Sequence, residues 1–342
     1  MNHDHFINHC LTLASKGRGK VGINPMVGSV LVREDQIIAE AFHEGFGLLH
    51  AERALLEHLS DRNRSGRSPV VSLVEPLSSA DVLYVNLEPC CHQGKTPPCT
   101  DIILEKGIKK VVFGMYDPNP EVSGKGIELL RNNGVLVTGP INPELCERFN
   151  KGFVSLQTNG RPYITLKRAQ TSSGAIAKPD GSPLKITSDE QDVWSHTHLR
   201  SRHDAILVGV GTIVSDDPQL TVRYGDTSYQ PYRIILDPEL RIPLEAKVLN
   251  DEYAKKTIII TQPKTTAPQQ HLSSGSVEKG IRIIEIPMKG DIFDLDELFN
   301  VLTTPTDDFH GISSILIEGG RKTWEAFESV KDEEVVLTNS SH

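Results

Sequence analysis

Residues 88–99 read Glu88-Pro89-Cys90-Cys91-His92-Gln93-Gly94-Lys95-Thr96-Pro97-Pro98-Cys99, and residues 50–52 read His50-Ala51-Glu52. The longer stretch follows a strand-like run, and the shorter one opens an apolar helical run. Together they supply one imidazole, two thiolates and one carboxylate that need not bind metal. This is the composition of a zinc site with three protein ligands, an open position for water and a glutamate that moves protons. The set predicts deamination of an amidine-like carbon in a pyrimidine.

The placement of each side chain supports this chemistry. Glu52 lies two positions after His50, so the two side chains face different directions on a helix. Cys99 is expected to begin a helix, where the positive end of the helix dipole favours a thiolate. Zinc lowers the pKa of a bound water from about 15.7 toward about 7. Glu52 is expected to take that proton and to deliver it to the ring nitrogen and the departing ammonia.

A simpler interpretation exists for each member of the set. A lone His-x-Glu is common, and a free cysteine is usually a small buried apolar group. The ordered set is more specific than its members. Its spacing departs from the usual Cys-x-x-Cys of zinc deaminases, because eight residues separate Cys90 from Cys99.

Hydrophobic patterning predicts alternating helices and strands along the whole chain, which favours α/β architecture. In the first half we expect helices at 6–17, 50–59, 99–106 and 124–133, and strands at 27–32, 36–42, 82–87, 110–116 and 135–139. In the second half we expect strands at 163–168, 205–210, 232–236, 257–261, 281–286 and 314–317, and a helix near 190–201. Residues 60–81 and 262–280 are polar and predicted as loops.

The pattern breaks around 146–160, where Thr158-Asn159-Gly160-Arg161-Pro162 is typical of a loop. We therefore predict a first domain at 1–147, a linker at 148–160 and a second domain at 161–342. A chain of 342 residues is long enough for two domains with separate cores.

Composition restricts the class of protein. The chain has 38% hydrophobic and 24% charged residues and a net charge of −9, which argues against a nucleic-acid surface. There is no long apolar run and no basic-then-apolar start, so we expect a cytoplasmic protein without a membrane partner. Three of the five cysteines lie within 90–99, which indicates metal chemistry and no disulfide framework.

Longer motifs resemble the bacterial bifunctional riboflavin-biosynthesis deaminase–reductase family. They are the 88–99 stretch, Asn24-Pro25-Met26-Val27-Gly28, His43, Asp117-Pro118-Asn119-Pro120, Asn150-Lys151-Gly152-Phe153, Arg161-Pro162-Tyr163, Val208-Gly209-Val210-Gly211-Thr212, Asp216-Asp217-Pro218 and Glu318-Gly319-Gly320. The resemblance spans nearly the whole chain. It implies a cytidine-deaminase-like three-layer domain followed by a dihydrofolate-reductase-like α/β domain.

The resemblance also implies substrates and site residues for the first domain. The substrate would be 2,5-diamino-6-ribosylamino-4(3H)-pyrimidinone 5′-phosphate. His50, Cys90 and Cys99 would hold zinc, with Glu52 as the catalytic proton carrier. The substrate pocket would be lined by Asn24, His43, His92, Lys95, Asp117 and Asn119. For Asn24 and Asn119, the alternative is ordinary turn chemistry beside proline.

For the second domain, the resemblance implies NADPH-dependent reduction of 5-amino-6-(5-phosphoribosylamino)uracil to the ribitylamino product. The matching substrate positions are Lys167, Thr187, Arg200, Asp216, Leu220, Arg223 and Glu318. The matching cofactor positions are Ala169, Thr171, Gly209, Gly211, Thr212, Gly319 and Gly320. Two arginines suit phosphate recognition, although an exposed arginine is more often a solvated surface residue. We also expect a homo-oligomer.

Three departures from the family concern the second domain. Ser173 stands where the family usually has an acidic residue, and Lys185 stands where it usually has tryptophan. Family members continue beyond the position of His342 through another strand, so we expect a domain truncated at its carboxyl end. A monofunctional deaminase with a degenerate reductase domain is therefore the main alternative.

Two further alternatives come from other classes of protein. A tRNA-adenosine or cytidine deaminase is disfavoured by the acidic balance, the long spacing between cysteines and the appended domain. A structural zinc module with Cys91 or His92 as fourth ligand leaves Glu52 without a role.

Overall fold

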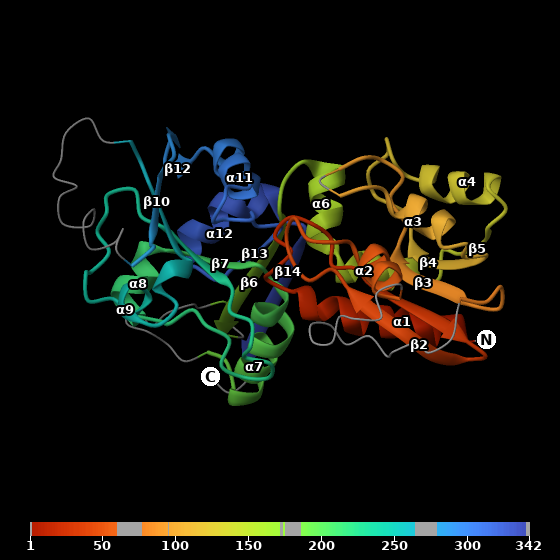
Figure 1. The fold of residues 1–342 in the computed structure, drawn as a ribbon. Helices are drawn as coiled ribbons and strands as arrows, with labels where there is room; N and C mark the ends of the chain where they lie inside the picture. The colour runs from red at the N-terminus through yellow and green to blue at the C-terminus, as the bar shows by residue number, and fades with distance from the viewer. Residues whose placement is uncertain are drawn as a thin grey trace. The chain divides into compact units, whose positions relative to one another are not determined.

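The computed structural model describes residues 2–59, 77–94, 96–171, 174, 186–263 and 279–339. The chain divides into two compact units (Figure 1). One contains Met1–Gly160 and Pro305–His310, and the other contains Arg161–Thr304 and Gly311–His342. Within the described residues, no helix is both long enough and apolar enough to span a membrane. The loops expected at 60–81 and 262–280 lie mostly outside the described residues.

The first unit is built on a five-stranded sheet in the order β2-β1-β3-β4-β5. Its strands are β1 (Gly28–Arg33), β2 (Gln36–Phe42), β3 (Val82–Leu87), β4 (Lys110–Met115) and β5 (Leu136–Thr138). β1 is antiparallel to β2 and β3, whereas β3, β4 and β5 are parallel. Glu34 and Asp35 join the first two strands with positive φ at both positions, as the twist of a tight hairpin favours.

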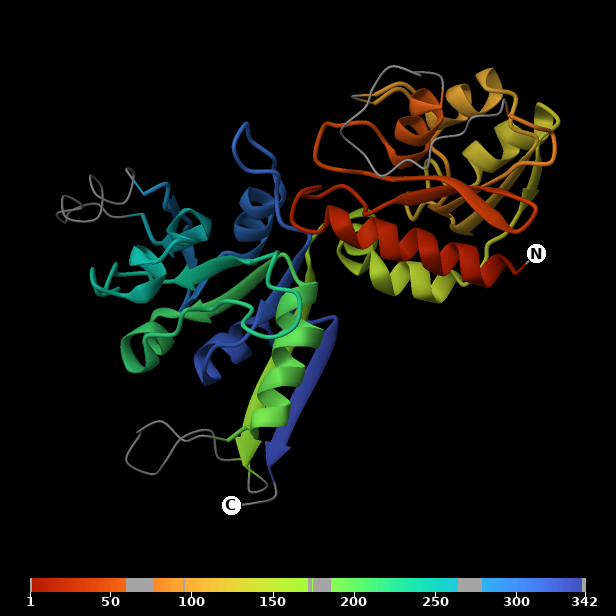
Figure 2. The same cartoon turned by 60° about the horizontal axis from the view of Figure 1, so that its bottom comes forward.

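Helices cover both faces of this sheet (Figure 2). They are α1 (His3–Ala14), α2 (Ala51–His58), α3 (Cys99–Glu105), α4 (Lys125–Asn132), α5 (Pro143–Phe149) and α6 (Lys151–Asn159). Successive strand residues point to opposite faces. Val30 and Val32 pack in a cluster with α1 and α5, whereas Leu31 packs in another with α2 and α3. The three-layer arrangement expected for this domain is confirmed.

The predicted linker at 148–160 is wrong, because these residues complete α5 and form α6. Phe149, Phe153 and Val154 pack against the core of the first unit. α6 ends at Asn159 and is capped by Gly160, which adopts the left-handed conformation with φ 66° that favours glycine after a helix end. The helical periodicity of this segment was not recognised in the sequence, because Pro143 and the polar residues around it interrupt the apolar pattern.

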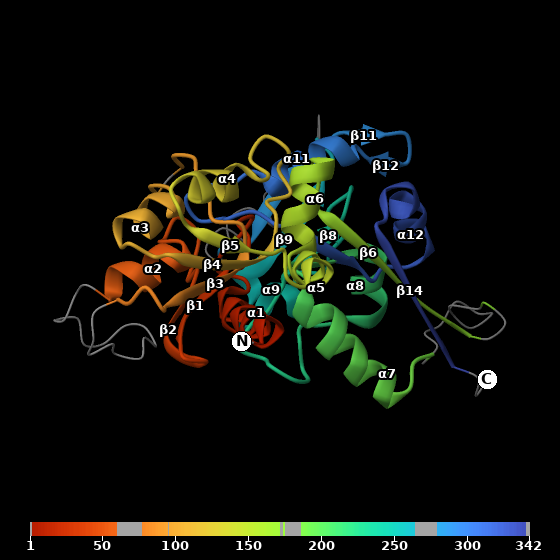
Figure 3. The ribbon, with the colours of Figure 1, turned by 90° about the vertical axis from the view of Figure 1, so that its right-hand side faces the viewer.

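The second unit is built on a seven-stranded sheet in the order β10-β9-β8-β7-β13-β6-β14, in which every neighbouring pair is parallel. Figure 3 shows β14 running beside β6. The strands are β6 (Tyr163–Thr171), β7 (Ala205–Gly209), β8 (Tyr232–Leu236), β9 (Thr257–Thr261), β10 (Arg282–Glu285), β13 (Ser314–Ile317) and β14 (Glu333–Asn339). A separate hairpin joins β11 (Met288–Lys289) to β12 (Ile292–Phe293). The central strands of the seven-stranded sheet are nearly continuous runs of buried residues, as parallel sheets covered on both faces require.

The helices of the second unit connect these strands. They are α7 (Asp189–Trp194), α8 (Val210–Asp216), α9 (Lys247–Asn250), α11 (Leu295–Thr303) and α12 (Arg321–Phe327). α7 begins with a capping box between Ser188 and Gln191, which satisfies two free amides at the helix start. A π-helical turn, Ser195–Leu199, and a 3₁₀ turn, Arg200–Arg202, extend it. The helix expected near 190–201 is therefore irregular in its second half.

Candidate active sites

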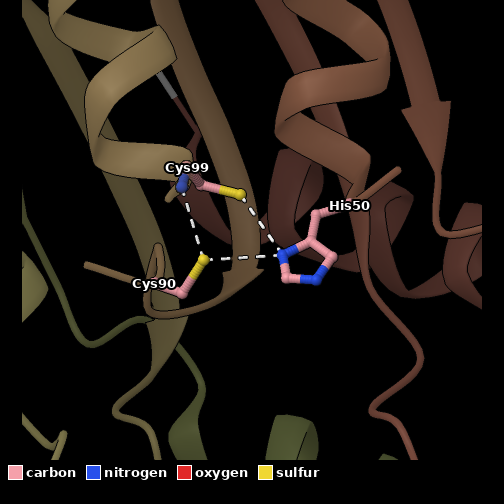
Figure 4. Close-up of side chains that lie close together, drawn as sticks. All are labelled: His50, Cys90 and Cys99. Atoms are coloured by element: carbon pink, nitrogen blue, oxygen red, sulfur yellow. Dashed lines mark hydrogen bonds between the residues drawn. The ribbon is translucent and has the colours of Figure 1, made fainter. Parts of the chain in front are cut away.

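Three predicted zinc ligands lie together in the first unit. His50 is the N-cap of α2, Cys90 follows β3 and Cys99 is the first residue of α3. Their ligand atoms lie within 4.8 Å of one another. Figure 4 shows both sulfur atoms near the Nδ1 atom of His50, and each sulfur–nitrogen distance is 3.5 Å.

The geometry and chemistry of this group fit zinc. Zinc–sulfur bonds of about 2.3 Å and zinc–nitrogen bonds of about 2.0–2.1 Å at a tetrahedral angle separate sulfur from nitrogen by about 3.5 Å. Cys90 and Cys99 meet His50 at this distance. Among the described residues, the group contains neither Cys91 nor His92. The alternative of a closed four-ligand structural site therefore receives no support from this geometry.

Backbone contacts fix the two cysteines relative to each other. The Cys99 amide donates to the Cys90 sulfur at 3.3 Å, and the Thr100 amide donates to the Cys90 carbonyl at 3.1 Å. The first amides of a helix have no partner within the helix. The start of α3 therefore binds the Cys90 loop. This explains how eight intervening residues can separate two ligands of one metal.

Hydrogen bonds, burial and nearby charges shift the pKa values of Cys90, His50 and Glu52. Hydrogen bonds from Cys99 and His50 lower the pKa of the Cys90 thiol. The hydrogen bond with Cys90 raises the pKa of His50. Glu52 is buried, with 3% of its surface exposed. Burial and then the charge of Cys90 raise the pKa of Glu52 to about 7, which is typical of a group that exchanges protons at neutral pH.

Glu88 is a buried positioning residue that the sequence interpretation did not single out. Its carboxylate accepts hydrogen bonds from the amides of Asp117, Gly124, Gly126 and Ile127 at 2.8–3.3 Å. These bonds hold the segment between β4 and α4 against the start of the Cys90 loop. Four backbone donors thus satisfy the oxygen acceptors of this buried carboxylate.

Two asparagines, Asn86 and Asn150, hold Met26 and Gly28 near the site, and sequence reasoning assigned neither a positioning role. Asn86 accepts from the Gly28 amide at 2.8 Å and donates to the Met26 carbonyl at 3.1 Å. Asn150 accepts from the Met26 amide at 2.9 Å and donates to its carbonyl at 3.0 Å. The segment that begins at Asn24 is thereby fixed from two sides.

Two of the expected pocket residues, Asn24 and His43, lie beside the metal ligands. Asn24 Nδ2 is 3.4 Å from His43 Nε2, and His43 Nδ1 donates to the Leu49 carbonyl at 2.9 Å. The rings of His43 and His50 meet edge to face with centroids 5.7 Å apart. Burial lowers the pKa of His43. His43 is therefore a neutral group that accepts from Asn24.

The other expected pocket residues differ in their surroundings. Burial raises the pKa of Asp117, whose side chain accepts from the Asn119 amide at 2.9 Å. Asn119 accepts from the Glu121 amide at 2.9 Å, which is the turn chemistry weighed as its alternative role. His92 is exposed, and Lys95 lies outside the described residues.

In the second unit, most of the expected site residues gather at one edge of the sheet. Gly209 is the last residue of β7, and Glu318 follows β13. Lys167, Ala169 and Thr171 lie in the second half of β6. Carboxyl ends of parallel strands meet at the same edge, where open α/β sheets bind ligands.

Glycines at this edge serve two purposes. A Cβ atom at Gly209 or Gly319 would lie 3.0 or 2.6 Å from the Thr323 hydroxyl, so both glycines allow α12 to pack closely. A Cβ atom at Gly211 or Gly320 would meet nothing within 4 Å. The backbone at these two positions is open to a ligand.

A buried ion pair connects two of the expected substrate positions. Arg200 donates to the Glu318 carboxylate from Nε at 3.0 Å and from a terminal nitrogen at 2.6 Å. It also donates to the Thr221 carbonyl at 3.0 Å. Burial raises the pKa of Glu318, but the charges of Arg200 and Lys167 outweigh it and lower the pKa to about 2.

The remaining expected residues of the second unit are dispersed. Thr187 donates to Asp192 at 2.6 Å. Leu220 is buried with φ 52°, whereas Asp216 is exposed at the end of α8 and Thr212 is half-buried in its first turn. The departures Ser173 and Lys185 lie outside the described residues. Sequence reasoning missed His196, which lies one helical turn before Arg200 and between two arginines.

Family models match both halves of the chain. Residues 1–115 match the zinc-binding region of cytidine and deoxycytidylate deaminases. Residues 162–329 match the RibD C-terminal domain. The first match contains all three predicted zinc ligands and Glu52.

Relatives and solved structures resemble the chain over nearly its whole length. Riboflavin biosynthesis protein RibD of Aquifex aeolicus is 41% identical over 94% of this chain and 82% of its own. The Escherichia coli protein of the same name is 31% identical over 94% and 82%. A crystal structure of a diaminohydroxyphosphoribosylaminopyrimidine deaminase/5-amino-6-(5-phosphoribosylamino)uracil reductase from Thermotoga maritima has a TM-score of 0.78 at 34% identity, covering 99% of this chain and 87% of that one. The chain belongs to the RibD family of riboflavin biosynthesis proteins.

Proposed function

We propose that this chain catalyses two consecutive steps of riboflavin biosynthesis. The first unit hydrolytically deaminates 2,5-diamino-6-ribosylamino-4(3H)-pyrimidinone 5′-phosphate. The second unit reduces 5-amino-6-(5-phosphoribosylamino)uracil with NADPH to the ribitylamino product. The observation that carries the proposal is the meeting of His50, Cys90 and Cys99 beside a buried Glu52.

In the first unit, His50, Cys90 and Cys99 would hold the zinc ion. When bound there, zinc would supply an activated water molecule, by lowering its pKa toward about 7. Glu52 would take one proton from the attacking water and give it to the ring nitrogen, and would then take the second proton from the resulting hydroxyl group and give it to the amine, which leaves as ammonia. Burial raises the pKa of Glu52 to about 7, which suits a carboxylate that takes up and releases protons near neutral pH. Asn24 and His43 orient the pyrimidine, and Asp117 supplies a further acceptor.

In the second unit, NADPH would lie over the open backbone at Gly211 and Gly320. NADPH supplies the hydride, so the protein binds and orients two anionic ligands. Lys167, Arg200 and Arg223 provide positive charge for the phosphorylated substrate. Glu318 holds Arg200 in place through the bidentate pair.

A coupled assay of the purified chain tests this proposal. Ammonia release from the diamino substrate and NADPH oxidation with the deaminated intermediate are measured separately. We expect turnover in both. Ammonia release without NADPH oxidation would instead support a monofunctional deaminase with a degenerate second domain, and absence of both activities would contradict the proposal.

A further inference from the structure

His196 lies between two arginines, and the proposed function assigns no role to this histidine. It lies in the π-helical turn Ser195–Leu199, one turn before Arg200. Only 3% of its surface is exposed. Its imidazole meets the backbone of Arg223 on one side and the guanidinium groups of Arg200 and Arg223 on the other.

The backbone contact determines which ring nitrogen carries the proton. The Arg223 amide donates to His196 Nδ1 at 3.0 Å, so Nδ1 is an acceptor. A neutral imidazole then carries its proton on Nε2. Burial, followed by the charges of Arg200 and Arg223, lowers the pKa of His196 to about 4 against opposing contributions from Glu318 and Asp192. The ring is therefore neutral near pH 7.

The Nε2–H group points at groups that cannot accept its hydrogen bond. Nε2 lies 3.4 Å from a terminal nitrogen of Arg200 and 3.3 Å from one of Arg223. Guanidinium nitrogens only donate. Within the described residues, neither Nε2 nor the Arg223 guanidinium has an oxygen acceptor in hydrogen-bonding range. The Tyr224 ring meets the imidazole edge to face, with centroids 5.2 Å apart.

Donors from His196, Arg200 and Arg223 thus converge on one place, where, among the described residues, only the Arg200 nitrogen has an acceptor, the Thr221 carbonyl. The charges of Arg200 and Arg223 act on His196 here against those of Glu318 and Asp192. Glu318 is itself paired with Arg200 and lies under the charge of Lys167. An anion with several oxygens satisfies converging donors of this kind.

We propose that His196 binds the phosphate group of the reductase substrate as an Nε2–H donor, together with Arg200 and Arg223. This inference rests on the proposed function, which supplies the phosphorylated substrate. It assigns His196 to substrate binding, with a fixed tautomer set by the Arg223 backbone.

Two substitutions separate the two nitrogens of the ring. His196→Asn keeps an acceptor near the Nδ1 position and removes the Nε2 donor. His196→Gln places an amide donor near the Nε2 position. We expect His196→Asn to raise the KM for the phosphorylated substrate about tenfold, because a donor to a charged group is lost. We expect His196→Gln to restore most of this loss.

Specificity for phosphate is measured with the same substrate lacking its phosphate group. The KM for that compound should be the same in the wild-type chain and in His196→Asn. The exposed His198, two residues along the same turn, provides the control variant His198→Asn, which should alter neither KM. A His196→Asn effect that is equal for both compounds, or absent for both, would overturn the proposal.

A second measurement is independent of reductase activity. Titration of the full chain with inorganic phosphate, followed by ³¹P NMR, should show saturable binding that His196→Asn weakens about tenfold and His196→Gln retains. If the wild-type chain oxidises no NADPH, the proposed function fails, and this titration alone decides the role of His196. Equal phosphate affinity in the wild-type and His196→Asn chains would refute that role.

Discussion

Glu52 and His50 are two residues apart at the start of α2 and differ in their expected roles. We predict that Glu52→Gln retains zinc but lowers the rate of deamination by about 10²–10⁴-fold, the usual contribution of a general acid–base. The amide has the shape of the carboxylate but cannot carry the proton. Ammonia release and zinc content are measured on the same preparation.

Glu57 provides a matched control on the same helix, because its side chain is partly exposed and pairs with Arg53 at 2.8 Å. Glu57→Gln should keep both zinc and deamination. Full activity in Glu52→Gln would show that another group moves the proton.

The lowered pKa of Glu318 predicts how the free energy of unfolding depends on pH. Its pKa is lowered to about 2 in the folded chain, compared with about 4.3 for an unperturbed glutamate. A lowered carboxylate pKa stabilises the folded state above the unfolded pKa, and this contribution disappears as pH falls from about 4.3 to about 2. This lowering of the pKa corresponds to about 3 kcal/mol of the free energy of unfolding.

The free energy of unfolding of wild-type and Glu318→Gln chains is compared across this pH range. The difference between them should be largest at neutral pH and should shrink below pH 4.3. Glu325→Gln, at an exposed position of α12, should differ little from wild type throughout. A pH-independent difference for Glu318→Gln would contradict the assigned ion pair.

At the residue scale, the sequence was enough to identify site residues whose side chains are chemically distinctive. His50, Cys90 and Cys99 were expected together because few other functions need that set. Glu88 and His196 were not identified, because their roles depend on backbone amides brought from distant segments. No local pattern distinguishes a glutamate that binds four amides from one that lies on a surface.

At the element scale, the turn between β13 and α12 contains two adjacent glycines with opposite surroundings. Gly319→Ala would place a Cβ atom 2.6 Å from Thr323, so we expect destabilisation of about 1–3 kcal/mol. Gly320→Ala meets no atom within 4 Å. We expect its stability to lie within about 0.5 kcal/mol of wild type, whereas its KM for NADPH should rise.

Thermal unfolding and NADPH kinetics of both variants test this pair. An unchanged KM for NADPH in a stable Gly320→Ala chain would show that the cofactor does not approach this turn. Equal stability of the two variants would show that α12 can move away from Gly319.

Elements with a regular apolar pattern were predicted closely, and those with mixed patterns were missed. The strands at 36–42, 82–87, 232–236 and 257–261 have the expected bounds. β14 was missed because it lies at the edge of the sheet and alternates between half-buried and exposed residues. α11 was missed although Leu298, Phe299 and Leu302 bury one face, since the segment follows a polar turn.

At the scale of the whole molecule, each unit has its own core and its own candidate site. We therefore predict that removing zinc with a chelator abolishes ammonia release but preserves NADPH oxidation when the deaminated intermediate is supplied. Returning zinc should restore ammonia release. Loss of both activities on chelation, with recovery of both, would show that the reductase also requires the metal.

X-ray absorption at the zinc edge of the full chain tests the central claim, that His50, Cys90 and Cys99 hold one zinc ion with a further position open. We predict one zinc per chain, with two sulfur ligands at about 2.3 Å and the remaining ligands nitrogen or oxygen at about 2.0–2.1 Å. Cys99→Ser should remove one sulfur from this shell, whereas Cys91→Ser should leave both. A shell with three or four sulfurs, or one unchanged by Cys99→Ser, would contradict the assignment.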